Sequence, residues 1–375
     1  MRHFDGDLAD VTPSGLNRIF FSAGEASGDA YEAALAKQLS EFSLSGVGGR
    51  RSREAGVQLI GDSSQWGAIS ITESLRKVPV VIRTFYRAKR ALKTGAPGIF
   101  VPIDFGYMNI RLARHAKNHG WKVLYFVPPG SWRKDKQGRD LPLITDAIVT
   151  PFEWSAEMLN RMGANAFWFG HPLRELIALS PLGARNGIAV LPGSRDQELR
   201  ELIPVFAEAL KGEDVTLALA PATDAAAISA EWERRAGVKP QIIQGDAARA
   251  LQHAELALVC SGTATLESAI CGTPMVVAYR VSKAVQREAK LIRFKIPRRI
   301  SLPNILLDED PDPIPELVHD RCTADAIREE VAKVRADPDI QRQAFERLVP
   351  ILGPDDAIRR TSSLIREMAG RISSD

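Results

Sequence analysis

The sequence has few cysteines and no long apolar run, and both absences limit what the protein can be. Its three cysteines, Cys260, Cys271 and Cys322, form neither an even set for disulfides nor a C-x-x-C pair. This pattern suits a reducing compartment and argues against structural zinc. No stretch of about eighteen apolar residues occurs, and the N-terminus lacks the apolar centre of a secretory signal. We therefore expect no segment that spans a bilayer.

An excess of charge of one sign is also missing. The 375 residues carry 49 Lys and Arg against 46 Asp and Glu, which leaves a net charge of +3. So small an excess predicts no nucleic-acid partner, and any basic surface must be local. Residues 1–16 lack periodicity and are predicted to form a flexible tail. The expected compartment is the cytoplasm.

Along the rest of the chain, short apolar runs alternate with helical patterns. Continuous apolar strands such as 98–103 and 122–127 predict a parallel sheet covered by helices on both faces. The alternation restarts after 175–186, which contains Pro, Gly and Ser. We predict an α/β protein with two doubly wound, Rossmann-like domains, over 17–175 and 176–375, whose terminal helices could pack back on the first domain. Ligands of such sheets bind beyond the carboxyl ends of the strands, so we expect the site in an interdomain cleft.

The first strand runs into a turn of small residues, AGEASGD. Gly24 and Gly28 would let backbone N–H groups approach an anion at a helix start, with Glu25 and Ser27 in the same turn. The spacing is not G-x-G-x-x-G, so a dinucleotide fingerprint is poorly supported. The alternative is an ordinary strand-to-helix turn that is capped by Ser27 or Asp29. The turn alone leaves both interpretations open.

Two loops of the second domain follow strands and open helices. In LPGSR, Arg195 would direct its planar guanidinium into the cleft, which suits a phosphate. In SGTATLE, Ser261, Gly262 and Thr263 lie at a helix start and can hold a diphosphate. Glu267, one turn later, can reach ribose hydroxyls. The alternative is capping by Ser261 or Thr263 with Glu267 exposed, but two such loops in one domain favour nucleotide binding.

Two further residues are candidates by their positions. Asp104 ends an apolar strand of the first domain, and a partly desolvated acid there can take a proton from a hydroxyl nucleophile. An Asp at a strand tip is also a common N-cap. His171 lies at the domain junction before Pro172, where a lone His is more often structural than catalytic.

A basic segment between residues 74 and 94 has seven Lys or Arg and no acid. Apolar residues recur in it at helical spacing: Leu75, Val78, Ile82, Phe85, Ala88 and Leu92. Such a helix can lie in an anionic membrane interface, and its expected membrane contacts are Val78, Ile82, Phe85, Arg83 and Arg87. The alternative is an amphipathic helix packed on its sheet with a solvated basic face. Both interpretations also apply to a second basic stretch, 283–299.

Taken together, these segments resemble the lipid-A-disaccharide synthase family of GT-B glycosyltransferases. The match runs from about Arg18 to Val318. It rests on short motifs in a fixed order: AGEASGD (23–29), GVGG (46–49), the strand end Ile103-Asp104, PFE (151–153), GHPL (170–173), LPGSR with Glu198, SGTATLE (261–267), PMVVAYR (274–280) and SLPN (301–304). So many motifs in order are more specific than any one of them.

The resemblance implies a reaction and roles for single residues. The family joins UDP-2,3-diacylglucosamine to 2,3-diacylglucosamine 1-phosphate, forms a β-1,6 bond and releases UDP without a metal or cofactor. Asp104 matches the family's essential acid, a candidate general base, and Arg195 matches the arginine near the diphosphate. Glu267 takes the ribose role, and Asn304 lies in the SLPN motif near the nucleotide. The implied partners are a UDP-sugar donor, a lipid acceptor and the anionic inner face of the inner membrane, with homodimerisation left open.

The departures from the family pattern lie mostly in the first domain. The Pro and the second Asp of the family's I-D-A-P-D-F-N motif are Gly106 and Tyr107 here. The M-G-x-V-E-V and P-S-V-W-A-W-R motifs are altered at 66–71 and 128–133. We therefore expect the nucleotide-binding site to be intact, whereas the identity of the acceptor is left open. The alternatives are a relative with another acceptor, a UDP-sugar epimerase, and a catalytically silent nucleotide-sugar or lipid binder.

Overall fold

The computed structural model describes residues 17–63, 66, 71–131, 133–179, 183–282 and 298–370, and over 71–78 it describes the helical backbone alone. The tail predicted for 1–16 and most of the second basic stretch therefore lie outside the described residues.

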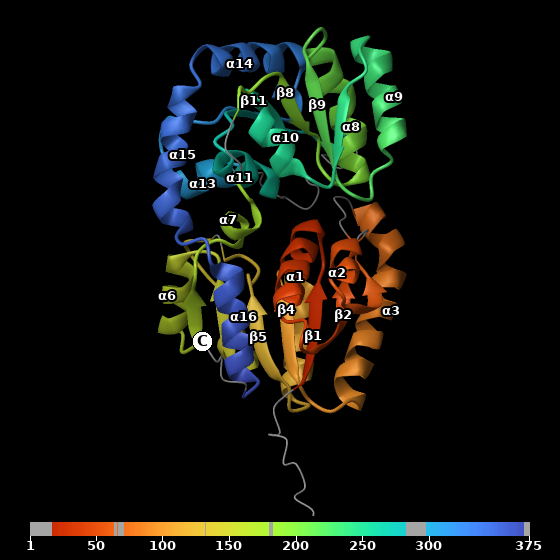
Figure 1. Ribbon diagram of the computed structural model, residues 1–375, viewed down its shortest axis with the longest axis vertical. Coiled ribbons are helices and arrows are strands. Elements are labelled where there is room, and N and C mark those ends of the chain that lie inside the picture. The colour runs from red at the N-terminus through yellow and green to blue at the C-terminus, as the bar shows by residue number, and fades with distance from the viewer. Residues whose placement is uncertain are drawn as a thin grey trace, which may run out of the picture.

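The N-terminal unit is a parallel sheet covered by helices on both faces (Figure 1). Its elements are β1 (Arg18–Ala23), α1 (Ala26–Gln38), β2 (Ser43–Gly48), α2 (Arg50–Glu54), β3 (Gln58–Asp62), α3 (Ile71–Thr94), β4 (Ile99–Ile103), α4 (Gly106–Lys117), β5 (Lys122–Phe126), α5 (Leu141–Ile144), β6 (Ala147–Thr150), α6 (Glu153–Arg161), β7 (Ala166–Trp168) and α7 (Pro172–Leu176). Within the described residues the strand order is β3-β2-β1-β4-β5-β6-β7. The central strand β4 is a continuous apolar run because both faces of the sheet are buried there.

The second unit repeats this architecture. Its elements are β8 (Ile188–Leu191), α8 (Asp196–Ala209), β9 (Val215–Leu219), α9 (Ala225–Ala236), β10 (Gln241–Gln244), α10 (Ala247–His253), β11 (Leu256–Cys260), α11 (Thr263–Ile270), β12 (Met275–Tyr279), α13 (Leu302–Leu307), β13 (Glu316–Val318), η1 (His319–Arg321), α14 (Ala324–Ala336), α15 (Asp339–Leu352) and α16 (Ala357–Met368). Its described strands are parallel, in the order β10-β9-β8-β11-β12-β13. The predicted fold class, an α/β protein with two doubly wound sheets, is confirmed.

The last helix, α16, leaves the second unit and packs on α1 of the first (Figure 1). Its N-terminus is held by Glu175, whose carboxylate accepts a hydrogen bond from the backbone N–H of Ile358 at 2.5 Å. Farther along, Arg366 pairs with Glu41 at 2.7 Å. One hydrophobic cluster contains residues of both sheets. Within the described part of the chain, the helices are too short or too polar to cross a membrane.

Candidate active site

Asp104 lies directly after β4 in a left-handed backbone conformation. Its φ is 48° and that of Phe105 is 42°, a region that costs a non-glycine residue roughly 1–3 kcal/mol. Buried side chains hold this turn in place. Asn109 Nδ2 donates to the carbonyls of Ile103 and Asp104 at 3.1 Å, and the Tyr125 hydroxyl donates to the Asp104 carbonyl at 2.8 Å. A strained turn with this much support is typical of a functional site.

The carboxyl group of Asp104 does not cap the helix α4. The N-cap of α4 is Phe105, with no side-chain hydrogen bond, so the capping interpretation of Asp104 is wrong. Burial raises the pKa of Asp104 to about 6, and the negative charge of Glu25 adds to the rise. A hydrogen bond from the backbone of Phe105 acts in the opposite direction. A carboxyl group with this pKa can exchange a proton near neutral pH.

The two glycines of the AGEASGD turn are explained by packing. A Cβ on Gly24 would lie 2.0 Å from Cγ of Phe105, so this position accepts only glycine. Gly28 is buried, and a Cβ there would lie 3.3 Å from that of Ala23. The Phe105 ring thus accounts for the glycine at position 24, and the approach of its backbone to a ligand stays a prediction.

The start of α1 nevertheless carries no side-chain cap among the described residues. Its N-cap is Glu25, and the predicted capping by Ser27 or Asp29 is wrong. Asp29 instead caps α2, where it accepts hydrogen bonds from the backbone N–H groups of Gly49 at 2.7 Å and Ser52 at 3.0 Å. The first N–H groups of α1, near Ser27, are therefore available to an anion.

Arg195 lies between two carboxylates, one from each unit. Its Nη1 lies 2.9 Å from Oε1 of Glu198, and its Nη2 lies 3.0 Å from Oε2 of Glu25. Glu198 also accepts hydrogen bonds from the backbone N–H groups of Ser194 and Arg195. Because Arg195 precedes α8 and Glu25 follows β1, this contact shows that the strand ends of the two sheets face each other.

The SGTATLE loop opens α11 with an exposed glycine as its N-cap. No described side chain caps the helix at Gly262, so capping by Ser261 or Thr263 is wrong. The Ser261 hydroxyl donates to the Ile300 carbonyl at 2.7 Å instead. Thr263 is the first helical residue. The backbone N–H groups at this helix start therefore lack a side-chain partner within the described chain and suit an anion.

Glu267 lies on the side of α11 that faces the first unit. Burial raises its pKa, and the positive charge of Arg51 acts in the opposite direction. Arg51 comes from α2 and donates to the Gly245 carbonyl at 2.9 Å, a second polar contact between the units. The pKa of Tyr31 in α1 is raised by burial and also by the charges of Glu267 and Asp104. Tyr31 is thus close enough to two carboxyl groups, one from each unit, for both charges to act on it.

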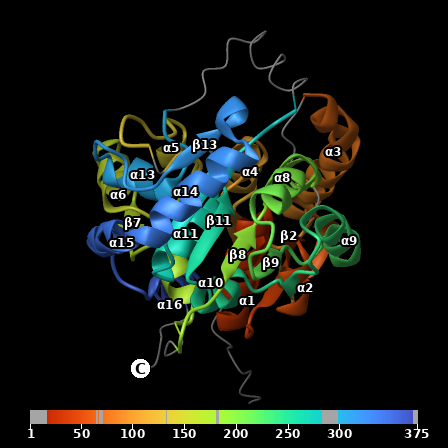
Figure 2. The same cartoon turned by 90° about the horizontal axis from the view of Figure 1, so that it is seen from above.

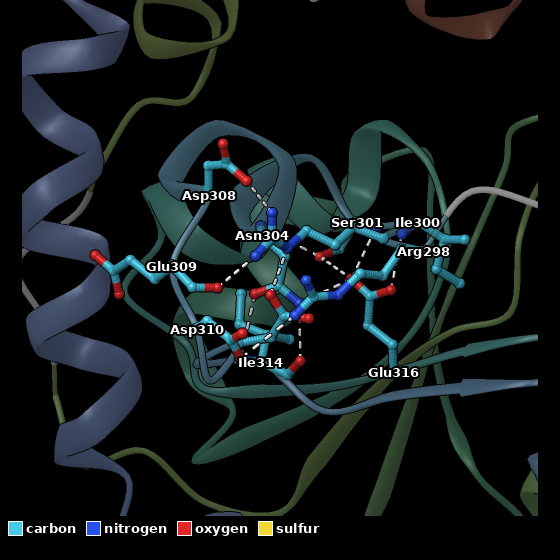
Figure 3. Close-up of polar contacts among 11 residues, drawn as sticks. Arg298, Ile300, Ser301, Asn304, Asp308, Glu309, Asp310, Ile314 and Glu316 are labelled. Carbon is cyan, nitrogen blue, oxygen red and sulfur yellow. Dashed lines mark hydrogen bonds and ion pairs between the residues drawn. The ribbon is translucent and has the colours of Figure 1, made fainter.

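Asn304 is fully buried, and its polar atoms are used within the protein (Figure 3). Its Nδ2 donates to the Ile314 carbonyl at 2.9 Å and to Glu316 Oε1 at 2.8 Å, and its Oδ1 accepts from the Ile314 N–H at 3.3 Å. The Asn304 side chain therefore makes three hydrogen bonds inside the second unit, and its place near the nucleotide stays a prediction.

Glu316 holds the start of the SLPN motif in place. This carboxylate accepts hydrogen bonds from the backbone N–H groups of Ile300 at 2.7 Å and Ser301 at 3.0 Å, and from Asn304 (Figure 3). Since Ile300 also accepts from Ser261, this cluster fixes the start of the SGTATLE loop.

Two of the departures from the family pattern lie against each other beside Asp104. A Cβ on Gly106 would lie 2.6 Å from Cγ of Pro129, so the altered 128–133 loop occupies the space that a larger residue at 106 requires. Tyr107 is 77% exposed, and the Arg111 guanidinium lies 4.0 Å from its ring centroid. An aromatic ring this exposed beside the candidate base offers a surface to a ligand.

The helix α3 lies at the outer margin of the molecule in both views (Figure 1 and Figure 2). Its Ala88 and Leu92 are buried, and Phe85 packs against the same cluster. The apolar positions predicted in residues 74–94 therefore do not share one environment, because those in the C-terminal part of the helix belong to the core. The exposed apolar side chains are Val80 (57%), Ile82 (48%) and Tyr86 (63%), and Arg83 and Arg87 are exposed beside them. The predicted contact Val78 lies outside the described side chains.

His171 and the described end of the second basic stretch make structural contacts. Burial lowers the pKa of His171 to about 3, and its Nδ1 accepts from the Leu173 N–H at 3.3 Å as the N-cap of α7. In the second basic stretch, Arg298 and Arg299 pair with Asp310 and Asp312 at 3.3 and 2.5 Å. In the described part of the chain, no His, Cys, Asp or Glu cluster could hold a metal ion.

Sequence reasoning missed three residues that support this site: Asn109, Tyr125 and Glu316. Asn109 stands in the segment that resembles the I-D-A-P-D-F-N motif, which is the one signal for it. Tyr125 lies within an apolar strand and Glu316 in a short strand near the chain's acidic segment, and neither position carries a pattern of its own.

Comparisons with known proteins find relatives that match most of the chain. The family model described as lipid-A-disaccharide synthetase matches residues 19–349. A lipid-A-disaccharide synthase of Geobacter sulfurreducens is 30% identical over 391 residues, covering 96% of this chain and 100% of the relative. That of Acidobacterium capsulatum is 31% identical over 397 residues, covering 96% and 98%.

Solved structures support the fold alone. MurG of Acinetobacter baumannii aligns with a TM-score of 0.56 at 14% identity, over 94% of this chain and 100% of its own. The UDP co-structure of MnaA from S. aureus aligns with a TM-score of 0.58 at 10% identity, over 96% and 99%. The predicted GT-B fold is therefore confirmed. Matched over most of its length by the family model, the chain belongs to the lipid-A-disaccharide synthetase family, whose members are glycosyltransferases of lipid A biosynthesis.

Proposed function

We propose that this enzyme transfers 2,3-diacylglucosamine from its UDP donor to a hydroxyl of 2,3-diacylglucosamine 1-phosphate, with inversion at the anomeric carbon. Asp104 takes the hydroxyl proton while the hydroxyl oxygen bonds to that carbon, and the bond from the carbon to the UDP oxygen breaks. Arg195 and the start of α11 stabilise the charge that develops on UDP. The proposed reaction uses no metal or cofactor.

One observation carries this proposal. A carboxyl group with a raised pKa lies at a strand end of one sheet, and the Glu25–Arg195 contact brings an arginine of the other sheet to the same place. The proposed base, Asp104, and the proposed phosphate-binding residue, Arg195, therefore lie in the same region between the two units. The other proposed substrate contacts are Ser27 and Gly28 at the start of α1, and Ser261, Gly262, Thr263 and Glu267 of the SGTATLE segment.

The direct test offers purified protein UDP-diacylglucosamine together with lipid acceptors and identifies the products by mass spectrometry. A disaccharide and UDP in equal amounts support the proposal. A disaccharide with another acceptor alone points to the altered Gly106–Tyr107 region. Conversion of the UDP-sugar without transfer would identify an epimerase, and bound but unchanged donor would identify a silent binder.

Replacing Arg195 by Ala is expected to weaken UDP binding by about 1.5–3 kcal/mol, because a charge-assisted contact with the diphosphate is lost. Isothermal titration calorimetry measures the affinity. Arg200→Ala, which removes an exposed arginine of the adjoining helix α8, is the control. If wild-type protein binds no UDP at millimolar ligand, the proposed nucleotide site is wrong.

We also propose that α3 contacts an anionic membrane through its exposed apolar and basic side chains. Replacing Val80 and Ile82 by Ser should lower vesicle binding about fivefold for each residue, and salt should weaken binding of the wild type. Flotation with anionic and neutral vesicles measures this. Val238→Ser, an exposed apolar residue of the second unit, is the control. Equal binding to both vesicle types at every salt concentration would contradict the electrostatic part.

A further inference from the structure

Glu25 and Arg195 form an ion pair between the two units, beside the proposed base. Their charged atoms lie 3.0 Å apart, and the side chains are 40% and 31% exposed, so a ligand can reach the pair. After burial, the charge of Glu25 is the largest cause of the raised pKa of Asp104. One carboxylate thus touches the arginine assigned to the diphosphate and also acts on the base.

The two partners of Arg195 differ in how firmly they are held. The Glu198 carboxylate is 4% exposed and also accepts backbone hydrogen bonds at the start of α8. The Glu25 side chain has Arg195 as its one polar partner among the described residues. A diphosphate that approaches Nη2 of Arg195 therefore displaces Glu25 and leaves Glu198 in place.

We propose that Glu25 is a positioning residue. It holds Arg195 between the units until the diphosphate of the donor takes the place of the Glu25 carboxylate. The negative charge of Glu25 then supports Asp104 as the base. This inference rests on the proposed function. Once the diphosphate has taken Arg195, the negative charge of Glu25 is no longer compensated by the guanidinium. Asp104 then becomes a stronger base when the donor is bound.

Other ionisable groups near Asp104 do not supply this effect. Tyr31 from α1 and Tyr125 from β5 face it, but burial raises the pKa of both hydroxyls, so they are neutral near pH 6. Glu267 from α11 acts on Tyr31, and burial raises its own pKa. Glu25 is thus the carboxylate that acts on Asp104 directly.

The test compares Glu25→Gln and Glu25→Asp with the wild type. Both variants should bind UDP about two- to fivefold more tightly, because the rival anion is removed or too short to reach Arg195. In Glu25→Gln the acid limb of the kcat/KM profile should move below about pH 6, since a charge that opposes ionisation of Asp104 is gone. In Glu25→Asp the acid limb of the kcat/KM profile should stay at the pH of the wild type, because the negative charge at position 25 is kept. Glu41→Gln, which removes a surface carboxylate paired with Arg366, should change neither quantity.

Unchanged or weaker UDP binding in both variants, with an unmoved acid limb in Glu25→Gln, would overturn the inference. It would make Glu25 a structural contact between the units. Failure of wild-type protein to bind UDP would instead overturn the proposed function. If Glu25→Gln does not fold, UDP binding by Glu25→Asp still decides whether the carboxylate and the diphosphate compete.

Discussion

Replacing Asp104 by Asn is expected to lower turnover about 10²–10⁴-fold, because the amide cannot take the acceptor's proton. Asn has nearly the same size and tolerates the left-handed φ of 48°. UDP affinity should be almost unchanged, since Arg195 and the start of α11 belong to the second sheet. Turnover, from mass spectrometry of the product, and UDP affinity should be measured on one preparation. Asp140→Asn, an exposed carboxylate of the same unit, is the control.

Thermal stability distinguishes this role from a structural one. The folded-state pKa of Asp104 is raised from 3.8 to about 6, so the folded protein binds this proton more tightly than the unfolded chain does. The stability that this proton provides is complete below about pH 4 and is lost as the pH rises through about 6. The Asn variant should therefore gain stability over the wild type across this range and melt higher at pH 8. Normal turnover, or a lower melting temperature at pH 8, would contradict the assignment.

The pH profile of the wild type follows from the same group. A general base must be ionised, so kcat/KM should rise with pH through about 6 and then level off. Activity that is constant between about pH 4.5 and 7.5 would contradict Asp104 as the base in the free enzyme.

The central strands could be predicted from the sequence because burial on both faces leaves a direct compositional signal. Ile99–Ile103 is apolar at every position, and every residue of this strand is buried. The two strands at one end of this sheet are less apolar: Ser43–Gly48 contains Gly and Ser, and Gln58–Asp62 contains Gln, Gly and Asp, so neither carries such a signal. The strand Ala166–Trp168 is too short for any periodicity.

The site could be predicted only where a residue occupies a strand end. Asp104 and Arg195 were found in this way, because parallel strands carry their ligands at carboxyl ends. The support of Asp104 depends on long-range contacts: Asn109 bonds Ser22, 87 residues away. Periodicity also cannot distinguish an apolar helix face that packs on a sheet from one that contacts a membrane. For this reason Ala88 and Leu92 belonged to the apolar face predicted for residues 74–94, although both are buried in the core.

Replacing Asn304 by Ala is expected to destabilise the second unit and to weaken UDP binding at the same time. The change removes three hydrogen bonds of a fully buried amide and leaves both backbone groups of Ile314 without this partner. Unsatisfied buried groups cost about 1–3 kcal/mol each, so a loss of roughly 2–3 kcal/mol is expected, or about 4–12 °C in melting temperature.

The effect on UDP should arise through Glu316, because this carboxylate loses one of the donors that hold it against the Ile300 segment, and Ile300 holds Ser261. The affinity loss should therefore be smaller than for Arg195→Ala. Calorimetry and thermal melts on one preparation measure both quantities, with the exposed Asn118→Ala as the control. If Asn304 touched the nucleotide directly, affinity would fall while the melting temperature stayed constant. That result would contradict the indirect role. In the indirect role one buried amide supports both the fold of the 301–316 segment and the position of the SGTATLE loop, so UDP affinity and melting temperature must fall together.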